Sequence, residues 1–331
     1  MTDTPRLPTT LPRQHGLTLV ELLVSMTIGL VLMLAVISAY IGASGASAMT
    51  QAQGRMNEDA QAALLILSQH VRMASYNPKQ PRYAVTGPYV PASFPGFVDT
   101  ARNPVYDAND WPIRGCDGTF SNITSAANVA SLACGTTGSD SLVVRYEADA
   151  NNTVRNSTLQ ATDCLGQQLP TATGTVNLWN TATSTVVSAT ATFSVAESRF
   201  YIATSGSSPN LYCKGNGGTT PQPLVENVED MQITYGVAPS DATAALTVGG
   251  YLSASELESV VTAPAFANLQ DRWSKVATVR ICLVVRSEQA LAPSADSARY
   301  NDCSGTTIAP TDLRLRRAYS TTIVLRNRVA T

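Results

Sequence analysis

Residues 17–37 read LTLVELLVSMTIGLVLMLAVI, an apolar run of 21 residues in which Glu21 is the single charged residue. As an α-helix, a run of this length is about 31 Å long, which matches the hydrocarbon core of a bilayer. A buried core helix is usually shorter and has a polar face, and this run has none. The run therefore predicts a helix that spans a membrane, with one carboxylate placed where a charge is costly unless it finds a partner.

The charges on either side of the run indicate its orientation. Arg6 and Arg13, with Asp3, precede the run, and no further Lys or Arg occurs until Arg55. Because cytoplasmic flanks are enriched in Lys and Arg, we expect the N-terminus to stay in the cytoplasm and the bulk of the chain to cross the membrane. The run is too long for an ordinary secretory signal, and the natural break precedes it, at Gly16-Leu17.

The residues around that break resemble a known processing motif. After a basic leader, residues 16–23 (GLTLVELL) are similar to the start of type IV prepilins and type II secretion pseudopilins. The resemblance implies that a prepilin peptidase cleaves after Gly16 and methylates the new N-terminus at Leu17. It also implies that Glu21 forms an assembly salt bridge with the N-terminus of a neighbouring subunit. A buried carboxylate is tolerable in an apolar medium when the next helix supplies its counter-charge.

A second helical pattern follows the apolar run. Small and apolar residues recur at three- and four-residue steps from Arg55 to Tyr76, and Asn77-Pro78 ends the pattern. His70, beside Gln69, is expected to be a polar residue that faces solvent or an interface, and the glycines between the two halves are expected to loosen their link. The expected organisation is a cleaved leader (1–16), a transmembrane N-terminal helix (17–46), an amphipathic continuation (47–76) and a periplasmic β-rich globular domain (77–331).

The rest of the chain reads as loops and strands. Segment 77–115 is rich in proline and aromatic residues and is expected to be a loop that covers a sheet. Within Val276–Val285 every second residue is apolar, which predicts a central antiparallel strand with one face on the helix. The predicted fold class is therefore α+β, with a long N-terminal membrane and amphipathic helix packed on an antiparallel β-sheet domain, which the resemblance identifies as pilin-like. The strand-like runs are Ser141–Ala148, Thr185–Val195, Arg199–Thr204, Met231–Val237, Ser274–Arg286 and Ala318–Arg328.

Three later segments are similar to the PilW family of minor pilins. They are residues 224–236 (LVENVEDMQITYG), 276–287 (VATVRICLVVRS) and 319–328 (YSTTIVLRNR). The first is interpreted as a short turn of helix that leads into a strand. Its acidic residues suggest a calcium site at first sight, but the ring of oxygen ligands that Ca²⁺ needs is not apparent, so a solvated acidic helical face is expected. The acidic residues are Glu226, Glu229 and Asp230.

Six cysteines follow the apolar run. An even number on the outer side of a bacterial membrane suggests disulfides, and fifteen connectivities are compatible with six cysteines. Loop lengths favour Cys116–Cys134 and Cys282–Cys303, which leaves Cys164–Cys213. No C-x-x-C pair occurs, which argues against a zinc ribbon or a thioredoxin-like redox site.

Composition and motifs argue against catalysis and against nucleic-acid binding. Charged residues make up 14 % of the chain, against roughly 25 % in an average soluble domain. The net charge of −2 supplies no basic field for nucleic acid, and the two histidines, His15 and His70, cannot build a multi-histidine metal centre. The sequence contains no G-x-S-x-G, H-E-x-x-H or phosphate-loop motif. We therefore expect a non-enzyme without cofactor or metal.

The PilW resemblance implies a function and a set of partners. It implies a minor pilin that helps to initiate type IV pilus assembly, sits at or near the pilus tip, and supports twitching motility and adhesion. The implied partners are the prepilin peptidase, the inner-membrane assembly machinery, other minor pilins and the major pilin through their N-terminal helices, and a large tip adhesin. The implied location is the inner membrane, as a single-pass protein, and then the pilus. Two alternatives remain: a J-type minor pseudopilin of type II secretion, and a membrane-anchored adhesin that enters no filament.

Overall fold

The computed structural model describes residues 16, 18–74, 89–91, 111–135, 137–149, 152–180, 182–183, 185–238, 248–259 and 269–328. Most of the aromatic and proline-rich segment 77–115 lies outside the described residues. The chain divides into two compact units, residues 1–51 and 52–331.

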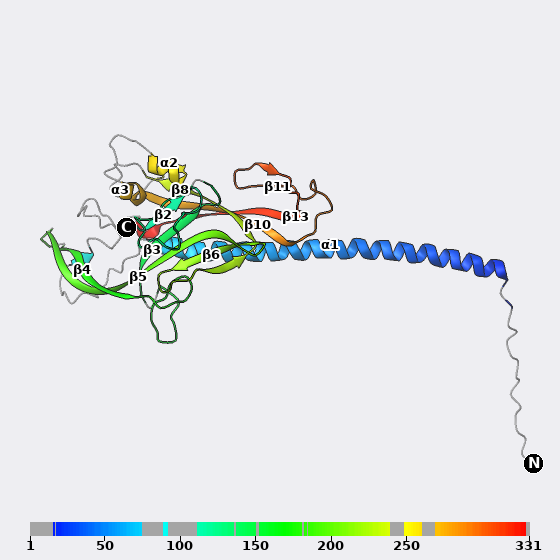
Figure 1. The fold of residues 1–331 in the computed structure, drawn as a ribbon, viewed down its shortest axis with the longest axis horizontal. Coiled ribbons are helices and arrows are strands. Elements are labelled where there is room, and N and C mark those ends of the chain that lie inside the picture. Colours follow the sequence, from blue (N-terminus) through cyan, green and yellow to red (C-terminus); the bar gives the residue numbers. More distant parts are fainter. Residues whose placement is uncertain are drawn as a thin grey trace, which may run out of the picture. The chain divides into compact units, whose positions relative to one another are not determined.

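One long helix, α1 (Leu19–Met73), begins in the first unit and ends in the second (Figure 1). It continues without a break through Gly42, Gly45 and Gly54, where the sequence predicted a loosened link. A helical glycine costs only about 1 kcal/mol relative to alanine, and the backbone hydrogen bonds on either side outweigh that cost.

The second half of α1 buries one stripe of small and apolar side chains. The buried residues recur at three- and four-residue steps, as the sequence pattern predicted. They pack between the helix and the β-rich domain: Tyr319 Oη donates a hydrogen bond to Asn57 Oδ1 (2.6 Å), and the ring centroid of His70 lies 5.2 Å from that of Phe200. The stripe comprises Met56, Ala60, Ala63, Leu67 and Val71.

A seven-stranded antiparallel sheet forms the first layer of the domain. Its main order is β1-β4-β5-β3-β2, with β6 paired to β5 and β7 paired to β6. Figure 1 labels strands β2 to β6 of this sheet. The bounds are β1 (Tyr89–Pro91), β2 (Ile113–Cys116), β3 (Ser141–Ala148), β4 (Thr171–Asn180), β5 (Thr185–Ser205), β6 (Ser208–Gly215) and β7 (Gln222–Glu226).

Strand β5 joins two segments that the sequence analysis predicted as separate strands, 185–195 and 199–204. It runs unbroken through Glu197, whose carboxylate lies 3.2 Å from Arg145 Nε and 2.6 Å from Arg199 Nη2. All three side chains are buried. The charges look like a strand boundary in the sequence, but their mutual pairing allows the strand to continue through them.

A second antiparallel sheet has the order β13-β10-β8-β9. Alternate residues of β10 from Val279 to Val285 are fully buried, as the alternation in the sequence predicted. The α+β fold class is confirmed. The bounds are β8 (Val228–Val237), β9 (Gly250–Leu252), β10 (Val276–Ala290) and β13 (Arg314–Val324), with smaller elements α2 (Ala254–Ser259), α3 (Leu269–Ser274), β11 (Tyr300–Asn301), β12 (Thr307–Ile308) and the 3-10 turn η1 (Arg326–Arg328).

The predicted helical turn in segment 224–230 is wrong. β7 ends at Glu226, β8 begins at Val228, and Asn227 between them has a positive φ of 60°. Asn227 donates its backbone N–H to Asn210 Oδ1 (3.2 Å), and its carbonyl accepts from the Arg286 N–H (3.0 Å). Asparagine tolerates this left-handed conformation, so a sharp corner between two sheet strands replaces the helix.

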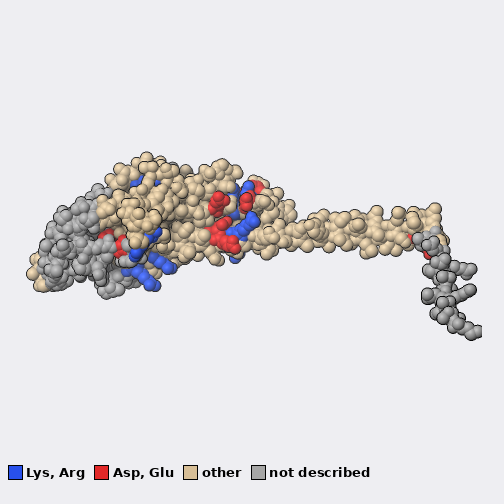
Figure 2. Space-filling view, turned by 90° about the horizontal axis from the view of Figure 1, so that it is seen from below, with Lys and Arg blue, Asp and Glu red and all other residues tan. Residues whose placement is uncertain are grey.

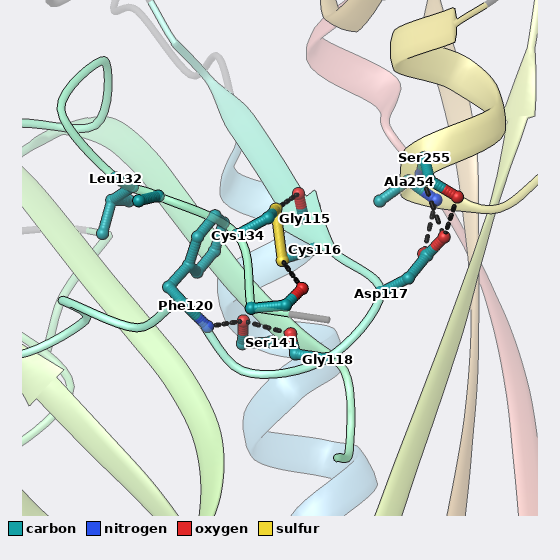
Figure 3. Close-up of a disulfide and its surroundings, with 12 residues drawn as sticks. Gly115, Cys116, Asp117, Gly118, Phe120, Leu132, Cys134, Ser141, Ala254 and Ser255 are labelled. Carbon is teal, nitrogen blue, oxygen red and sulfur yellow. Dashed lines mark hydrogen bonds between the residues drawn. A yellow bond between two sulfur atoms is a disulfide. The ribbon is translucent and has the colours of Figure 1, made fainter. Parts of the chain in front are cut away.

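Three disulfides brace the domain. The structure joins Cys116 to Cys134 and Cys282 to Cys303, the two pairs that the loop lengths favour, and Cys164 to Cys213, the pair that remains. Figure 3 shows the first of them beside the start of α2. There Asp117 accepts hydrogen bonds from the backbone N–H groups of Ala254 (2.7 Å) and Ser255 (3.0 Å), which ties the disulfide loop to that helix.

Two buried arginines hold the loop that the Cys116–Cys134 disulfide closes. Arg199 donates to the carbonyls of Ile123 (2.7 Å) and Ala126 (2.9 Å). Arg114 donates to two further carbonyls, those of Val129 and Leu132, both at 2.9 Å. The loop is therefore fixed by guanidinium groups from the sheet beneath it as well as by the covalent bond.

Candidate functional site

The start of α1 is closed by a reciprocal pair of hydrogen bonds between Thr18 and Glu21. Glu21 N–H donates to Thr18 Oγ1 (3.2 Å), and Glu21 Oε2 accepts from both the Thr18 N–H and the Thr18 hydroxyl, each at 3.0 Å. This is a capping box, in which the side chain at the cap and the side chain three residues later satisfy each other's backbone donor. In this structure Glu21 therefore serves its own helix.

The capping role of Glu21 was missed in the sequence, although the T-x-x-E pattern at Thr18 was readable. The apolar surroundings of Glu21 drew attention to its charge, and the resemblance assigned that charge to a neighbouring subunit. Both uses of the carboxylate involve donors at the N-terminal end of a helix. The structure thus gives Glu21 a resident partner, and the assembly salt bridge stays a prediction.

Gly16, the residue before the predicted cleavage point, has no packing reason to be glycine. A Cβ added at Gly16 meets nothing within 4 Å, and its φ is not in the left-handed region. Leu17, the predicted site of methylation, lies outside the described residues. If glycine is required at position 16, the requirement comes from an interaction with another molecule.

The first half of α1 exposes its apolar side chains. The large apolar residues from Leu19 to Ile41 are 48–77 % exposed, and α1 is the one helix among the described residues that is long and apolar enough to cross a membrane. Figure 2 shows this part of the helix as a surface free of Lys, Arg, Asp and Glu, apart from red near its N-terminal end. Such a surface needs lipid or other apolar helices to cover it.

The serine and threonine hydroxyl groups in this part of the helix form hydrogen bonds within the helix. Ser25 Oγ donates to the Glu21 carbonyl (2.7 Å), and Thr27 and Ser38 do the same to carbonyls three residues earlier (2.8 and 2.9 Å). In an apolar medium every polar group needs a partner within the protein. The serine and threonine residues are therefore compatible with membrane insertion.

The three acidic residues of segment 224–230, where a helical turn was predicted, do not converge on one point. Glu229 forms an ion pair with Arg316 (2.5 Å), and Asp230 accepts from Ser139 Oγ (2.6 Å). Glu226 lies near Asp59 instead: burial, and to a smaller extent the negative charge of Glu226, raises the pKa of the Asp59 carboxyl. Among the described residues, no three His, Cys, Asp or Glu side chains group in a way that could hold a metal ion.

His70 occupies the interface between α1 and the first sheet, one of the two environments expected for it. Tyr146 Oη and Ser198 Oγ each lie 3.4 Å from His70 Nδ1. Burial lowers the pKa of His70 to about 4, with a smaller opposing effect from Asp163. The neutral imidazole fills space between the helix and the sheet, next to the hydroxyl groups of Tyr146 and Ser198. In the described part of the chain, no arrangement for catalysis surrounds it.

A second buried titratable group joins the two sheets. Asp140, just before β3, accepts from the backbone N–H groups of Ile233 in β8 (2.7 Å) and of Gly118 (3.1 Å). Burial raises the pKa of Asp140 to about 7, against the lowering effect of these two hydrogen bonds. In the folded chain the Asp140 carboxyl and the His70 imidazole therefore titrate about three pH units apart, but the pH windows over which they change the stability of the fold overlap.

These two groups make opposite contributions to stability in acid. The unfolded chain protonates a histidine near pH 6.5 and the folded chain only near pH 4, so the His70 contribution falls by about 3 kcal/mol as the pH drops through that window. The folded chain protonates Asp140 near pH 7 and the unfolded chain near 3.8, so its contribution rises over a similar window.

Two variants should separate the opposite effects of His70 and Asp140 on the pH dependence of stability. Asp140→Asn should lose stability between pH 7 and pH 4.5, and His70→Gln should gain stability over the same range, each relative to its own value at pH 7. Urea unfolding followed by the fluorescence of buried Trp111 and Trp273 measures both slopes. Parallel slopes in the two variants would contradict the assignment of the two buried groups.

Comparisons with protein families match both parts of the chain. The family described as Type IV Pilus-assembly protein W matches residues 199–327, and the Prokaryotic N-terminal methylation motif matches residues 11–37. No curated protein and no solved structure matches the chain. The first match extends from the end of β5 to η1, and the second contains Gly16, the capping box and most of the exposed apolar stretch.

Proposed function

We propose that this chain, which is a PilW-like type IV pilin, helps to initiate pilus assembly as a minor subunit and occupies a place at or near the pilus tip. Its family associates it with type IV pili as a minor pilin and suggests a structural rather than a catalytic protein. The observation that carries the proposal is the exposed apolar helix of the first unit, in which Glu21 is the single charge.

The apolar helix supports a mechanism of transfer between two apolar environments. In the inner membrane, lipid covers the exposed side chains from Leu19 to Ile41. When the subunit leaves the membrane, that surface must be covered again, and the equivalent helices of other pilins supply a matching apolar surface. The subunit therefore passes from lipid to a bundle of pilin helices without exposing the helix to water.

Glu21 makes the helix bundle specific for processed pilin subunits, because its carboxylate pairs with their free amino group. Cleavage after Gly16 creates a new amino group at Leu17, and the amino group of a neighbouring subunit is the counter-charge that a carboxylate needs in a water-free bundle. In the free subunit, Thr18 already holds the Glu21 carboxylate at the helix start. Assembly then exchanges this neutral partner for a charged one on the next helix.

The β-rich domain is proposed to face outward and to make the contacts of the tip. Three disulfides and buried ion pairs such as Arg145–Glu197 suit a domain exposed to proteases and mechanical load. The proposed partners are the prepilin peptidase, the assembly machinery, the other minor pilins, the major pilin and a large tip adhesin. The processes that depend on such a complex are twitching motility and surface adhesion.

An epitope tag tests both the pilus location and the tip position. Val154 lies in a loop and is 71 % exposed, so a short tag inserted beside it should leave the fold intact. In sheared pili, we expect gold-labelled antibody at one end of the filament, and cells that lack the chain should form fewer pili. Labelling along the whole shaft would contradict the tip position, and absence of the tagged chain from sheared pili would contradict the proposal as a whole.

A further inference from the structure

The second half of α1 and strand β13 enclose an open groove. It is bounded by α1 residues between Gln61 and Met73 on one side and by Ser320 and Thr321 on the other, and its volume is about 630 Å³. Its floor and wall are partly apolar, because Leu64, Leu65 and Met73 line it, and Leu65 is 70 % exposed. We refer to it as the α1–β13 groove.

Two hydrogen bonds tie α1 to β13 and to the following turn η1 near the ends of the groove. Tyr319 Oη donates to Asn57 Oδ1 (2.6 Å) at one end, and Asn327 Nδ2 donates to the Arg72 carbonyl (3.0 Å) at the other. The helix between these anchors is about 22 Å long. This length accommodates an extended segment of about seven residues.

The groove reaches the free backbone edge of the second sheet. Ser320 and Thr321, which are adjacent in β13, both line the groove, so the groove extends to the strand itself. Among the described residues, β10 is the only strand that pairs with β13, so the other edge of β13 has no strand paired to it, although Tyr300 of β11 lies against Arg316 in its N-terminal part.

The C-terminal part of this edge, residues 319–324, has none of the usual protection against strand pairing, whereas Arg314, Arg316 and Arg317 lie in the N-terminal part of β13. Natural edge strands are commonly blunted by lysine, proline or a bulge. Residues 319–324 of β13 read YSTTIV, without a charge or a proline, and β-branched residues dominate. Val324 in this stretch is 47 % exposed. Such an edge is a ready template for an added strand.

The charges around the groove indicate the charge that an added strand should carry. Arg72 lines the groove, and Arg326 precedes Asn327, which holds the strand to the helix at that end. Neither arginine forms an ion pair within the described part of the chain, and none of the described residues that line the groove is acidic. A segment with a carboxylate at the end near Arg72 is the complementary ligand.

We infer that the α1–β13 groove binds an extended acidic segment of another pilin subunit, which adds as a strand to the free edge of β13. The segment pairs its backbone with β13, lays apolar side chains on Leu64, Leu65 and Met73, and places a carboxylate beside Arg72. This inference rests on the proposed function, because it takes the partner to be another subunit of the same pilus. The interaction would join globular domains, in addition to the contacts between N-terminal helices.

Site-specific cross-linking in cells tests the inference. A photo-reactive phenylalanine replaces Leu65 in the full chain, and the same residue at exposed Val154 is the control. After irradiation, mass spectrometry maps the cross-linked peptide. We expect the Leu65 probe to join an acidic, extended segment of a different pilin, and the Val154 probe to give no such product.

A charge reversal provides the matched comparison. Arg72→Glu should reduce the Leu65 cross-link by about tenfold, because it places like charges together. Arg299→Glu reverses a charge in a different surface region, where Arg299 pairs with Asp296 (2.7 Å), and should leave the yield within about twofold of the wild type. Equal losses in both variants would overturn the assigned role of Arg72.

Hydrogen exchange tests the strand pairing itself. On assembly, the backbone amides in 319–324 that face away from β10 should exchange at least about tenfold more slowly in sheared pili than in the detergent-solubilised subunit. Unchanged exchange there, or a Leu65 cross-link to the chain itself or to a non-pilin, would overturn the inference. If the tagged chain is present at pilus ends but these results fail, the groove inference is wrong and the proposed function stands; if the chain is absent from pili, the proposed function fails.

Discussion

Replacing Glu21 by valine is expected to reduce the amount of chain in sheared pili by at least about tenfold while leaving it in the membrane. The substitution makes the apolar run more hydrophobic, so insertion should be unaffected. It also leaves the amino group of a neighbouring subunit without its counter-charge in a water-free bundle. Quantitative immunoblots of the membrane fraction and of sheared pili measure the ratio.

Two further variants separate the charge of Glu21 from its capping role. Glu21→Gln keeps an oxygen that can accept from the Thr18 N–H but removes the charge, and Thr18→Ala removes the capping hydroxyl but keeps the charge. If the intersubunit salt bridge matters, Glu21→Gln should resemble Glu21→Val and Thr18→Ala should resemble the wild type. The reverse pattern would show that Glu21 acts only as a helix cap.

Replacing Gly16 by alanine should leave nearly all of the chain with residues 1–16 attached, and the uncleaved chain should stay in the membrane. The expected cause lies in the peptidase, whose site must approach the backbone closely where a side chain would intrude. The structure supplies no competing explanation, because a Cβ at Gly16 meets nothing within 4 Å. Electrophoretic mobility in cells that contain the peptidase measures the effect.

Gly42→Ala is the matched control for this experiment. Gly42 lies in the same α1 helix, and a Cβ added there also meets nothing within 4 Å. We expect normal processing in Gly42→Ala, since the substitution is remote from the cleavage point. Normal processing of Gly16→Ala as well would remove the basis for a peptidase site at this position.

The features that could be predicted from the sequence are those encoded by local patterns. The uninterrupted apolar run predicts the exposed half of α1, and the three- and four-residue spacing predicts its buried stripe. The alternation from Val276 to Val285 predicts β10 because every second side chain must enter the core. These patterns predict an element whatever segment packs against it, so the folded structure agrees with them.

The errors occurred where distant partners override local pattern. Segment 224–230 carries acidic residues at helical spacing, but β6 and β10 pair with it and turn it into two strands around Asn227. Glu197 and Arg199 look like a strand boundary until the fold brings Arg145, some 50 residues earlier, to the other side of Glu197, which then pairs with both arginines. Tertiary pairing of this kind outweighs local preference, and no window along the sequence contains it.

The candidate site shows the same division. Gly16, Leu17 and Glu21 form a contiguous motif that can be read in one pass. The α1–β13 groove combines a helix near residue 65 with a strand near residue 320. It lies along β13 because, among the described residues, no strand pairs with that edge of the sheet. Only the folded arrangement reveals that the edge of β13 and the apolar side of the helix face the same space.

The most direct measurement is the mass of the N-terminal peptide of the chain recovered from sheared pili. The account predicts a chain that begins at Leu17 with a methylated amino group, present in the filament fraction. A chain that begins at Met1 with an unmodified amine, in cells that process their other pilins, would contradict it.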